Sequence, residues 1–427
     1  MWNVRSTLLG ATVLLGSLLP ATPVLCAPLP EATPEDVGMS SQRLEQLAAT
    51  MQRAVDSGDL PGVVVMIARK GKLVYQKSFG MQDKAKNVPM SLDSIFRAYS
   101  MTKPVVSVAA MMLWEEGKLS LDEPISKYLP EFKDMKVGVE SFDAATGKQT
   151  FYTVPAKRQI TVQDLLRHTS GFTYGTYAIN TQVQKLYKDA GLFSQKWTLE
   201  AFCKELAKLP LMYEPGTVWE YSHSSDVLGR VVEVASGQPL DVFLSERIFK
   251  PLRMTDTAFQ VPPEKQGRIA QPQPDPKTGI SIELIDVTQP ATFFAGGHGL
   301  VTTASDYLRF AQMLSNGGEL EGARILGPRT VAYMASDHVL AAGISKGINW
   351  IPGAGYGFGL GFGVRKEPGA SDWPGSVGDF FWAGYAGTYF WVDPKEQLVP
   401  VLMSQEVTRR QHYRVVYRDL VYQAIMQ

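Results

Sequence analysis

The sequence predicts an α/β (α+β) protein: an antiparallel sheet flanked by helices, built from both chain ends, plus an all-α domain. Two β-rich segments and a helical region between them lead to this prediction. Residues 62–80, GVVVMIARKGKLVYQKSFG, form two β-branched runs joined at Lys70-Gly71, a hairpin signal. Residues 388–405, TYFWVDPKEQLVPVLMSQ, repeat the pattern with a D-P-K turn. We predict that the two hairpins belong to one sheet.

Helical periodicity accounts for the rest of the architecture. Residues 44–55 and 412–427 are amphipathic and flank the predicted sheet, whereas residues 160–167, 199–208 and 225–236 lie in the middle of the chain. We predict a discontinuous sheet domain of residues 28–95 and 281–427, with a mostly helical domain of residues 96–280. A ligand cleft is expected between these two domains.

The first 27 residues have the pattern of a signal peptide. Arg5 supplies a positive charge, Leu8 to Leu19 an apolar run, and Pro20 precedes small residues suitable for cleavage. The run is short for a bilayer span, so we expect export to the periplasm or outside the cell, with no integral span after cleavage. A lipid anchor on Cys26 is less favoured, because the preceding Leu25 is bulky.

Composition excludes several classes of function. The chain has 42 Lys and Arg and 42 Asp and Glu, and no basic stripe, which argues against a nucleic-acid partner. Once the leader is removed, Cys203 is the remaining cysteine, and its amphipathic context predicts a buried apolar role. No CxxC pair, HExxH motif or paired-histidine spacing is present, so neither a metal nor another cofactor is expected.

The stretch FRAYSMTKPVVSVAAMMLWEEGK, residues 96–118, holds the candidate nucleophile. Ser100 is the only serine followed three residues later by a lysine, Lys103. Pro104 is tolerated in the first turn of a helix, so a helix should begin near Ser100, with Lys103 on the same face. A desolvated lysine there can accept the serine proton. From this window alone, Ser100 could equally be an N-cap beside a solvated Lys103.

Other segments could supply a base or a rival nucleophile. His168 follows a helix end and His298 follows a glycine pair, whereas Tyr221 and His223 lie on a polar loop before an apolar helix. Residues 343–347, GISKG, match the G-x-S-x-G nucleophile elbow at Ser345. The elbow requires a helix after its serine, and the glycines and proline of residues 348–357 forbid one. We therefore interpret Ser345 as unrelated to catalysis.

Taken together, these segments resemble the serine β-lactamase and penicillin-binding protein superfamily, with its S-x-x-K signature. The similarity is closest to the class C β-lactamase-like branch that contains the family VIII carboxylesterases, and it covers nearly all of the mature chain. The hairpin of residues 61–80, the nucleophile helix, and the segments ITVQDLLRHTSGFTYG, GGHGLVTTASDYLRF and FWAGYAGTYFWVDPK occur in the family's order.

The resemblance implies a role for each matching residue. Ser100 would be acylated, Lys103 would assist its deprotonation, and Tyr221 would act as base and then as acid, with a pKa depressed by nearby cations. Trp382-Ala383-Gly384 takes the place of the K-T-G motif, and the backbone N–H groups of Tyr385 and Ser100 would form the oxyanion hole.

Two departures from the family pattern bear on the substrate. Trp382 replaces the lysine that binds an antibiotic carboxylate, and His223 replaces the asparagine that contacts a substrate amide. Both changes favour a small, neutral carboxylic ester, so we expect a serine carboxylesterase acting on a small-molecule ester. The alternatives are a β-lactamase, a D-alanyl-D-alanine carboxypeptidase, an acyltransferase or a catalytically silent binding module. The sequence leaves the oligomeric state open.

Overall fold

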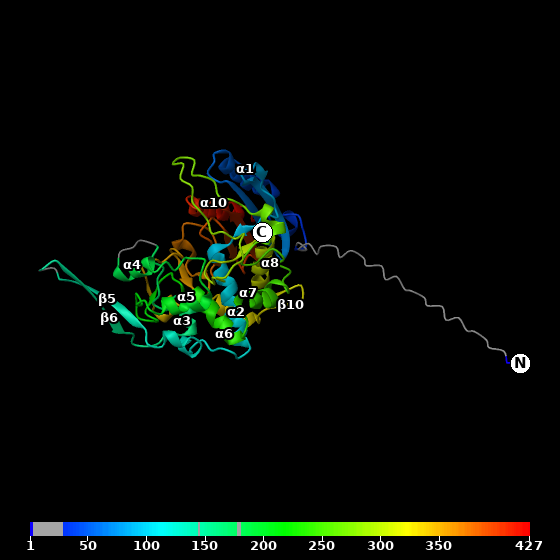
Figure 1. The fold of residues 1–427 in the computed structure, drawn as a ribbon. Helices are drawn as coiled ribbons and strands as arrows, with labels where there is room; N and C mark the ends of the chain where they lie inside the picture. The colour runs from blue at the N-terminus through cyan, green and yellow to red at the C-terminus, as the bar shows by residue number, and fades with distance from the viewer. Residues whose placement is uncertain (3–28, 144–145, 177–180) are drawn as a thin grey trace.

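The computed structural model describes residues 1–2, 29–143, 146–176 and 181–427 (Figure 1). The predicted signal peptide, including Cys26, lies almost wholly outside this range. Within the described part, no helix is both long enough and apolar enough to cross a membrane.

An eight-stranded antiparallel sheet forms the centre of the molecule and draws its strands from both ends of the chain. Its order is β12-β13-β14-β15-β16-β1-β2-β3. The N-terminal strands are β1 (Gly62–Arg69), β2 (Lys72–Asp83) and β3 (Val88–Pro89), and the C-terminal strands are β12 (Tyr356–Phe358), β13 (Gly363–Arg365), β14 (Phe380–Ala383), β15 (Tyr389–Val392) and β16 (Leu398–Ser404). The predicted fold class is confirmed.

The two halves of the sheet meet where β1 pairs with β16, from Val63 opposite Ser404 to Arg69 opposite Leu398. The predicted hairpin turn between β1 and β2 is present, with φ of 52° at Lys70 and 75° at Gly71. Two successive positive φ values are typical of the two-residue turns whose twist matches that of the flanking strands.

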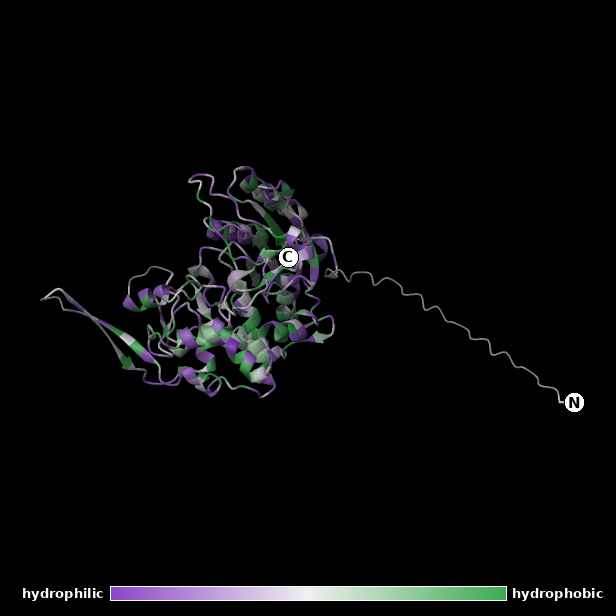
Figure 2. Cartoon of the chain, in the orientation of Figure 1, coloured by the Kyte–Doolittle hydropathy of each residue, from purple (hydrophilic) through white to green (hydrophobic). Residues whose placement is uncertain are grey.

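Helices cover both faces of the sheet because successive side chains of a strand point to opposite sides. Val63, Val65 and Ile67 pack in one cluster with α1 (Ser41–Asp56) and α10 (Arg410–Tyr422). Val64 and Met66 pack in the other, with α2 (Thr102–Glu115) and α8 (Ala304–Ser315). The outer helix α1 carries hydrophobic and hydrophilic residues together (Figure 2), whereas α2 is buried on all sides from Thr102 to Leu113.

The middle of the chain is rich in short helices, as expected. They are α3 (Val162–Leu166), α4 (Gln182–Asp189), α5 (Leu199–Leu206), α6 (Ser224–Ser236) and α7 (Leu240–Leu244), and α9 (Pro328–Met334) follows α8. Short strands also occur outside the main sheet: β4 (Phe96–Arg97), β7 (Val218–Trp219), β8 (Val301–Thr302), β9 (Glu319–Leu320), β10 (Ala323–Arg324) and β11 (Ser345–Lys346). The predicted domain limits stay a prediction.

One feature of the middle region was not predicted from the sequence. Strands β5 (Lys136–Asp143) and β6 (Lys148–Pro155) pair antiparallel as a hairpin that projects from the body of the molecule (Figure 1). Phe151 and Tyr152 are exposed on it. With little apolar surface to bury, the hairpin lacks the strong hydrophobic alternation by which a strand is identified in a sequence.

A buried ion cluster joins the sheet to α10. Asp379 lies just before β14, and its Oδ2 accepts a hydrogen bond of 2.7 Å from Nε of Arg365 and a second bond from Arg418 on α10. All three side chains are almost fully buried. Removing one partner from such a cluster leaves charge in the interior without compensation.

We expect Asp379→Ala to lower the free energy of unfolding by about 3–5 kcal/mol, because the Arg365 and Arg418 guanidinium groups would stay buried without a carboxylate. Urea denaturation followed by circular dichroism measures this change. Asp372→Ala is the control, because Asp372 is exposed in the same region and its loss should change stability by less than about 0.5 kcal/mol. Equal stability of the two variants would contradict the prediction.

Candidate active site

Ser100 and Lys103 lie at the start of the most buried helix. Ser100 belongs to a short 3-10 turn, Tyr99–Met101, that leads directly into α2. Lys103 is in the first turn of α2, and its Nζ lies 3.2 Å from Ser100 Oγ. Tyr99, just before the serine, has a φ of 47°, a left-handed conformation that is uncommon for a tyrosine. The predicted pairing of Ser100 with Lys103 on one helical face is therefore present.

The environment of Lys103 makes it a proton acceptor. Its side chain is 2 % exposed, and burial lowers its pKa from 10.5 to about 7, although Asp226 acts in the opposite direction. Lys103 Nζ also donates a 2.7 Å hydrogen bond to the carbonyl oxygen of Gly297. Near neutral pH a large fraction of Lys103 is thus uncharged and can take a proton from Ser100.

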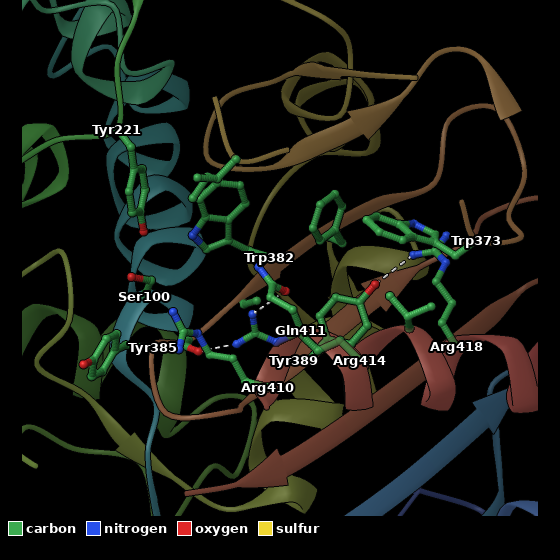
Figure 3. A pocket seen from close by; sticks show the side chains of 15 residues that line it. Ser100, Tyr221, Trp373, Trp382, Tyr385, Tyr389, Arg410, Gln411, Arg414 and Arg418 are labelled. Carbon is green, nitrogen blue, oxygen red and sulfur yellow. Dashed lines mark hydrogen bonds between the residues drawn. The ribbon is translucent and has the colours of Figure 1, made fainter. Parts of the chain in front are cut away.

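Tyr221 brings a hydroxyl group to the same place from another segment. It lies between β7 and α6, and in Figure 3 its hydroxyl points toward Ser100, beside the Trp382 indole. Lys103 Nζ is 4.7 Å from the centre of the Tyr221 ring. The predicted depression of the Tyr221 pKa is wrong: burial raises it, and hydrogen bonding to Ser100 and Trp382 offsets this only in part.

A cavity of about 240 Å³ opens in front of Ser100 (Figure 3). Aromatic and aliphatic side chains line it together with three arginines of α10. Its lining residues include Ser100, Tyr221, Ile351, Trp373, Phe381, Trp382, Gly384, Tyr385, Tyr389, Arg410, Arg414 and Arg418. Of the predicted site residues, Ser100, Tyr221, Trp382, Gly384 and Tyr385 thus share one cavity.

The end of β14 and the turn after it present the W-A-G segment to the cavity. The Trp382 ring packs against Tyr221, with ring centroids 5.5 Å apart. Gly384 lies where a Cβ atom would be 2.3 Å from the carbonyl oxygen of Ala98, so only glycine lets this turn approach the nucleophile segment so closely. Arg414 donates to the carbonyl oxygens of Gly384 and Thr388 and so holds the turn from the α10 side.

His223 does not line the cavity. Its side chain is fully buried, and its Nδ1 lies 3.0 Å from Asp226 Oδ2. His168, which the sequence suggested as a helix-end residue, lies with its ring centroid 5.1 Å from that of Tyr221. Burial lowers the pKa of both histidines, so both rings are neutral near pH 7.

The sequence analysis did not identify Arg410, Arg414 and Arg418 as site residues. Their spacing of four residues places them on one face of α10, which is the signal that could have found them. Arg418 donates hydrogen bonds to the carboxylate of Asp379 and to the hydroxyl of Tyr389. Arg410 lies over the Tyr385 ring, 5.0 Å from its centre, and among the described residues no carboxylate forms an ion pair with it.

The remaining motif at Ser345 lacks the geometry of a nucleophile elbow. Ser345 is exposed on the two-residue strand β11, and no α-helix follows it before α10. Cys203 is buried, as predicted. Within the described ranges, no group of three or more potential ligand side chains is arranged to hold a metal ion.

A family model and several known proteins match most of this chain. The Beta-lactamase family model matches residues 47–423. Protein Rv1367c of Mycobacterium tuberculosis is 37% identical over 365 residues, covering 84% of this chain and 88% of the relative. Esterase EstB of Burkholderia gladioli is 31% identical over 355 residues, covering 78% and 83%.

Among solved structures, EstCE1, described as a hydrolase with promiscuous acyltransferase activity, superposes with a TM-score of 0.73 at 27% identity. The match covers 89% of this chain and 98% of EstCE1. The extent of these matches, together with the serine and lysine at the start of α2, shows that the chain is an enzyme of the serine hydrolase type and belongs to the Beta-lactamase family.

Proposed function

We propose that this protein hydrolyses small carboxylic esters through an acyl-enzyme formed on Ser100. The observation that carries the proposal is the buried Lys103 amine, which lies 3.2 Å from the Oγ of Ser100. Ser100 in turn lines a cavity that it shares with several aromatic side chains. The esterase relative and the hydrolase structure that resemble this chain support the same class of substrate. Export to the periplasm or the cell exterior remains part of the proposal.

The proposed acylation step follows from the positions of three side chains. Ser100 Oγ attacks the ester carbonyl carbon, and its proton passes to the neutral amine of Lys103. The tetrahedral intermediate then expels the alcohol, which receives a proton through the hydroxyl of Tyr221. The raised pKa of Tyr221 suits a hydroxyl that passes a proton on rather than a permanent phenolate base.

Deacylation uses the same groups in the same roles. A water molecule attacks the acyl carbon, and its proton passes through the hydroxyl of Tyr221 to the neutral amine of Lys103. The tetrahedral intermediate then expels Ser100 Oγ, which takes that proton back from Lys103. Replacing the water with an alcohol would give acyl transfer, the activity that EstCE1 carries besides hydrolysis. The ratio of hydrolysis to transfer then depends on how well water and the alcohol compete for the cavity.

We expect Ser100→Ala to lower the hydrolysis of p-nitrophenyl acetate and butyrate by at least about 10³-fold, because it removes the hydroxyl that lies 3.2 Å from the Lys103 amine and that the proposed mechanism acylates. Ser345→Ala is the matched control, and its activity should stay within about twofold of the wild type. Loss of activity in the Ser345 variant with an active Ser100 variant would place the nucleophile at the exposed β11 strand instead.

We expect kcat/KM for a neutral ester to rise with pH through about 7 and then level off, because Lys103 accepts a proton only when uncharged and burial lowers its pKa to about 7. Tyr221→Phe should lower the plateau by about 10²-fold and keep the midpoint. A midpoint that disappears in the Tyr221 variant would assign the titration to that residue instead of Lys103.

A second candidate function is penicillin recognition, favoured by Arg410. This arginine lines the same cavity as Ser100 and could bind the carboxylate for which the family pattern provides a lysine, here Trp382. If so, nitrocefin, which carries a carboxylate, should be hydrolysed by the wild type at a rate comparable with ester turnover.

Arg410→Ala separates the two functions. A hydrogen bond to a charged group contributes about 1.5–3 kcal/mol, so removing it should lower kcat/KM for nitrocefin by about tenfold or more. The neutral ester, which has no charge to bind, should change by less than about twofold. An equal effect on both substrates would mean that Arg410 shapes the cavity and does not recognise an anion.

A further inference from the structure

A buried carboxylate, that of Asp226, is connected to Lys103 through a single residue, Gly297. Asp226 is in the first turn of α6 and is fully buried. Its Oδ1 accepts a 2.8 Å hydrogen bond from the backbone N–H of Gly297, and its Oδ2 lies 3.0 Å from His223 Nδ1. None of the sequence motifs identifies this residue, which follows Tyr221 by five positions in the sequence.

The turn that contacts Asp226 is packed so tightly that it requires glycine. A Cβ atom on Gly297 would lie 2.9 Å from both carboxylate oxygens of Asp226. A Cβ atom on Gly296 would lie 2.2 Å from the carbonyl oxygen of Ser225. The glycine pair of the sequence AGGHG therefore lets this turn lie directly against the start of α6.

The opposite side of the same turn holds Lys103. The carbonyl oxygen of Gly297 accepts the 2.7 Å hydrogen bond from Lys103 Nζ, which in turn lies 3.2 Å from Ser100 Oγ. One residue thus links the carboxylate to the lysine, because its N–H bonds to Asp226 and its C=O bonds to Lys103. A shift of this turn would move the amine away from the serine.

The charges around Lys103 leave Asp226 as its counter-ion. The groups that face the lysine are the rings of Tyr174 and Tyr221, His168, and the Asp226 carboxylate with its two histidine neighbours, His223 and His298. Burial lowers the pKa of His298 to about 4 and that of His223 below its usual value, so these rings are uncharged at neutral pH. Asp226 stays ionised: burial acts against this, but the His223 hydrogen bond and the neighbouring positive charge keep its pKa low.

We propose that Asp226 is a positioning residue for catalysis, which fixes the Gly296-Gly297 turn, holds the Lys103 amine against Ser100 through the Gly297 carbonyl, and supplies the buried negative charge that this amine requires. The inference rests on the proposed role of Lys103 as the base. It assigns a purpose to the buried His223 as well, because His223 donates to the Asp226 oxygen that the turn does not use.

The test is the pH dependence of the nucleophilic attack by Ser100, measured as the rate of inactivation by a fluorophosphonate. In that reaction Ser100 Oγ forms a bond to phosphorus and fluoride leaves. Asp226→Asn keeps an oxygen that can accept the Gly297 N–H but removes the charge. A nearby negative charge favours the protonated lysine, so its removal should lower the pKa of Lys103. The pH at which the inactivation rate is half-maximal should therefore be lower than in the wild type by about one unit. Asp164→Asn removes an equally buried carboxylate that is paired with Arg158, and its midpoint should not move.

A second variant tests the turn itself and replaces the first if Asp226→Asn does not fold. The added Cβ of Gly297→Ala would contact both oxygens of Asp226 and push the turn from its place. Inactivation by the fluorophosphonate should slow by about tenfold or more. Gly267→Ala is the control, since a Cβ there meets no atom within 4 Å, and its rate should match the wild type.

The outcomes distinguish the two proposals. A wild-type midpoint near 7 that stays unchanged in Asp226→Asn, or a Gly297→Ala rate equal to that of Gly267→Ala, would overturn the positioning role of Asp226. A wild type with no midpoint near pH 7 would instead overturn the role of Lys103 as the base. A lower midpoint in Asp226→Asn alone, with Asp164→Asn unchanged, is the result expected.

Discussion

The arrangement of the active site depends on the burial of one amino group, Lys103 Nζ. A lysine that is 2 % exposed requires hydrogen-bond acceptors and a negative charge close by, because the desolvation of an isolated charge is costly. The acceptors are Ser100 Oγ and the Gly297 carbonyl, and the charge is that of Asp226. These groups come from the turn that leads into α2, from the Gly296-Gly297 turn and from α6. The hydrogen bonds and the charge that Lys103 requires therefore bring three distant segments together.

The sheet and its covering helices give this arrangement its rigidity. Helix α2 is buried from Thr102 to Leu113, which leaves Ser100 little freedom to move relative to the sheet. Arg414 of α10 binds the carbonyl oxygens of Gly384 and Thr388, and the Arg365, Asp379 and Arg418 cluster anchors the same helix to β14. The turn that lies against the nucleophile segment is thus held by α10.

Membership of the Beta-lactamase family establishes the fold and the hydrolase class, whereas the substrate depends on the residues that line the cavity. Trp382 adds apolar surface where the family pattern has a cation, and Arg410 places a cation elsewhere on the wall of the same cavity. One change favours a neutral ester and the other an anion. The choice between the two proposed activities, esterase and penicillin recognition, therefore depends on how Trp382 and Arg410 contact the substrate.

The sequence by itself determined what is local. Hydrophobic periodicity predicted the sheet hairpins and most helices, and the three-residue spacing of Ser100 and Lys103 predicted their contact, because both depend on neighbours within a turn or a strand. The exposed hairpin of residues 136–155 lacked such a pattern. Only the tertiary structure decided the raised pKa of Tyr221, the position of Asp226 behind Lys103 and the presence of the three α10 arginines at the cavity. These features come from burial and from contacts between residues as far apart as Lys103 and Gly297, separated by 194 positions, which no local pattern encodes.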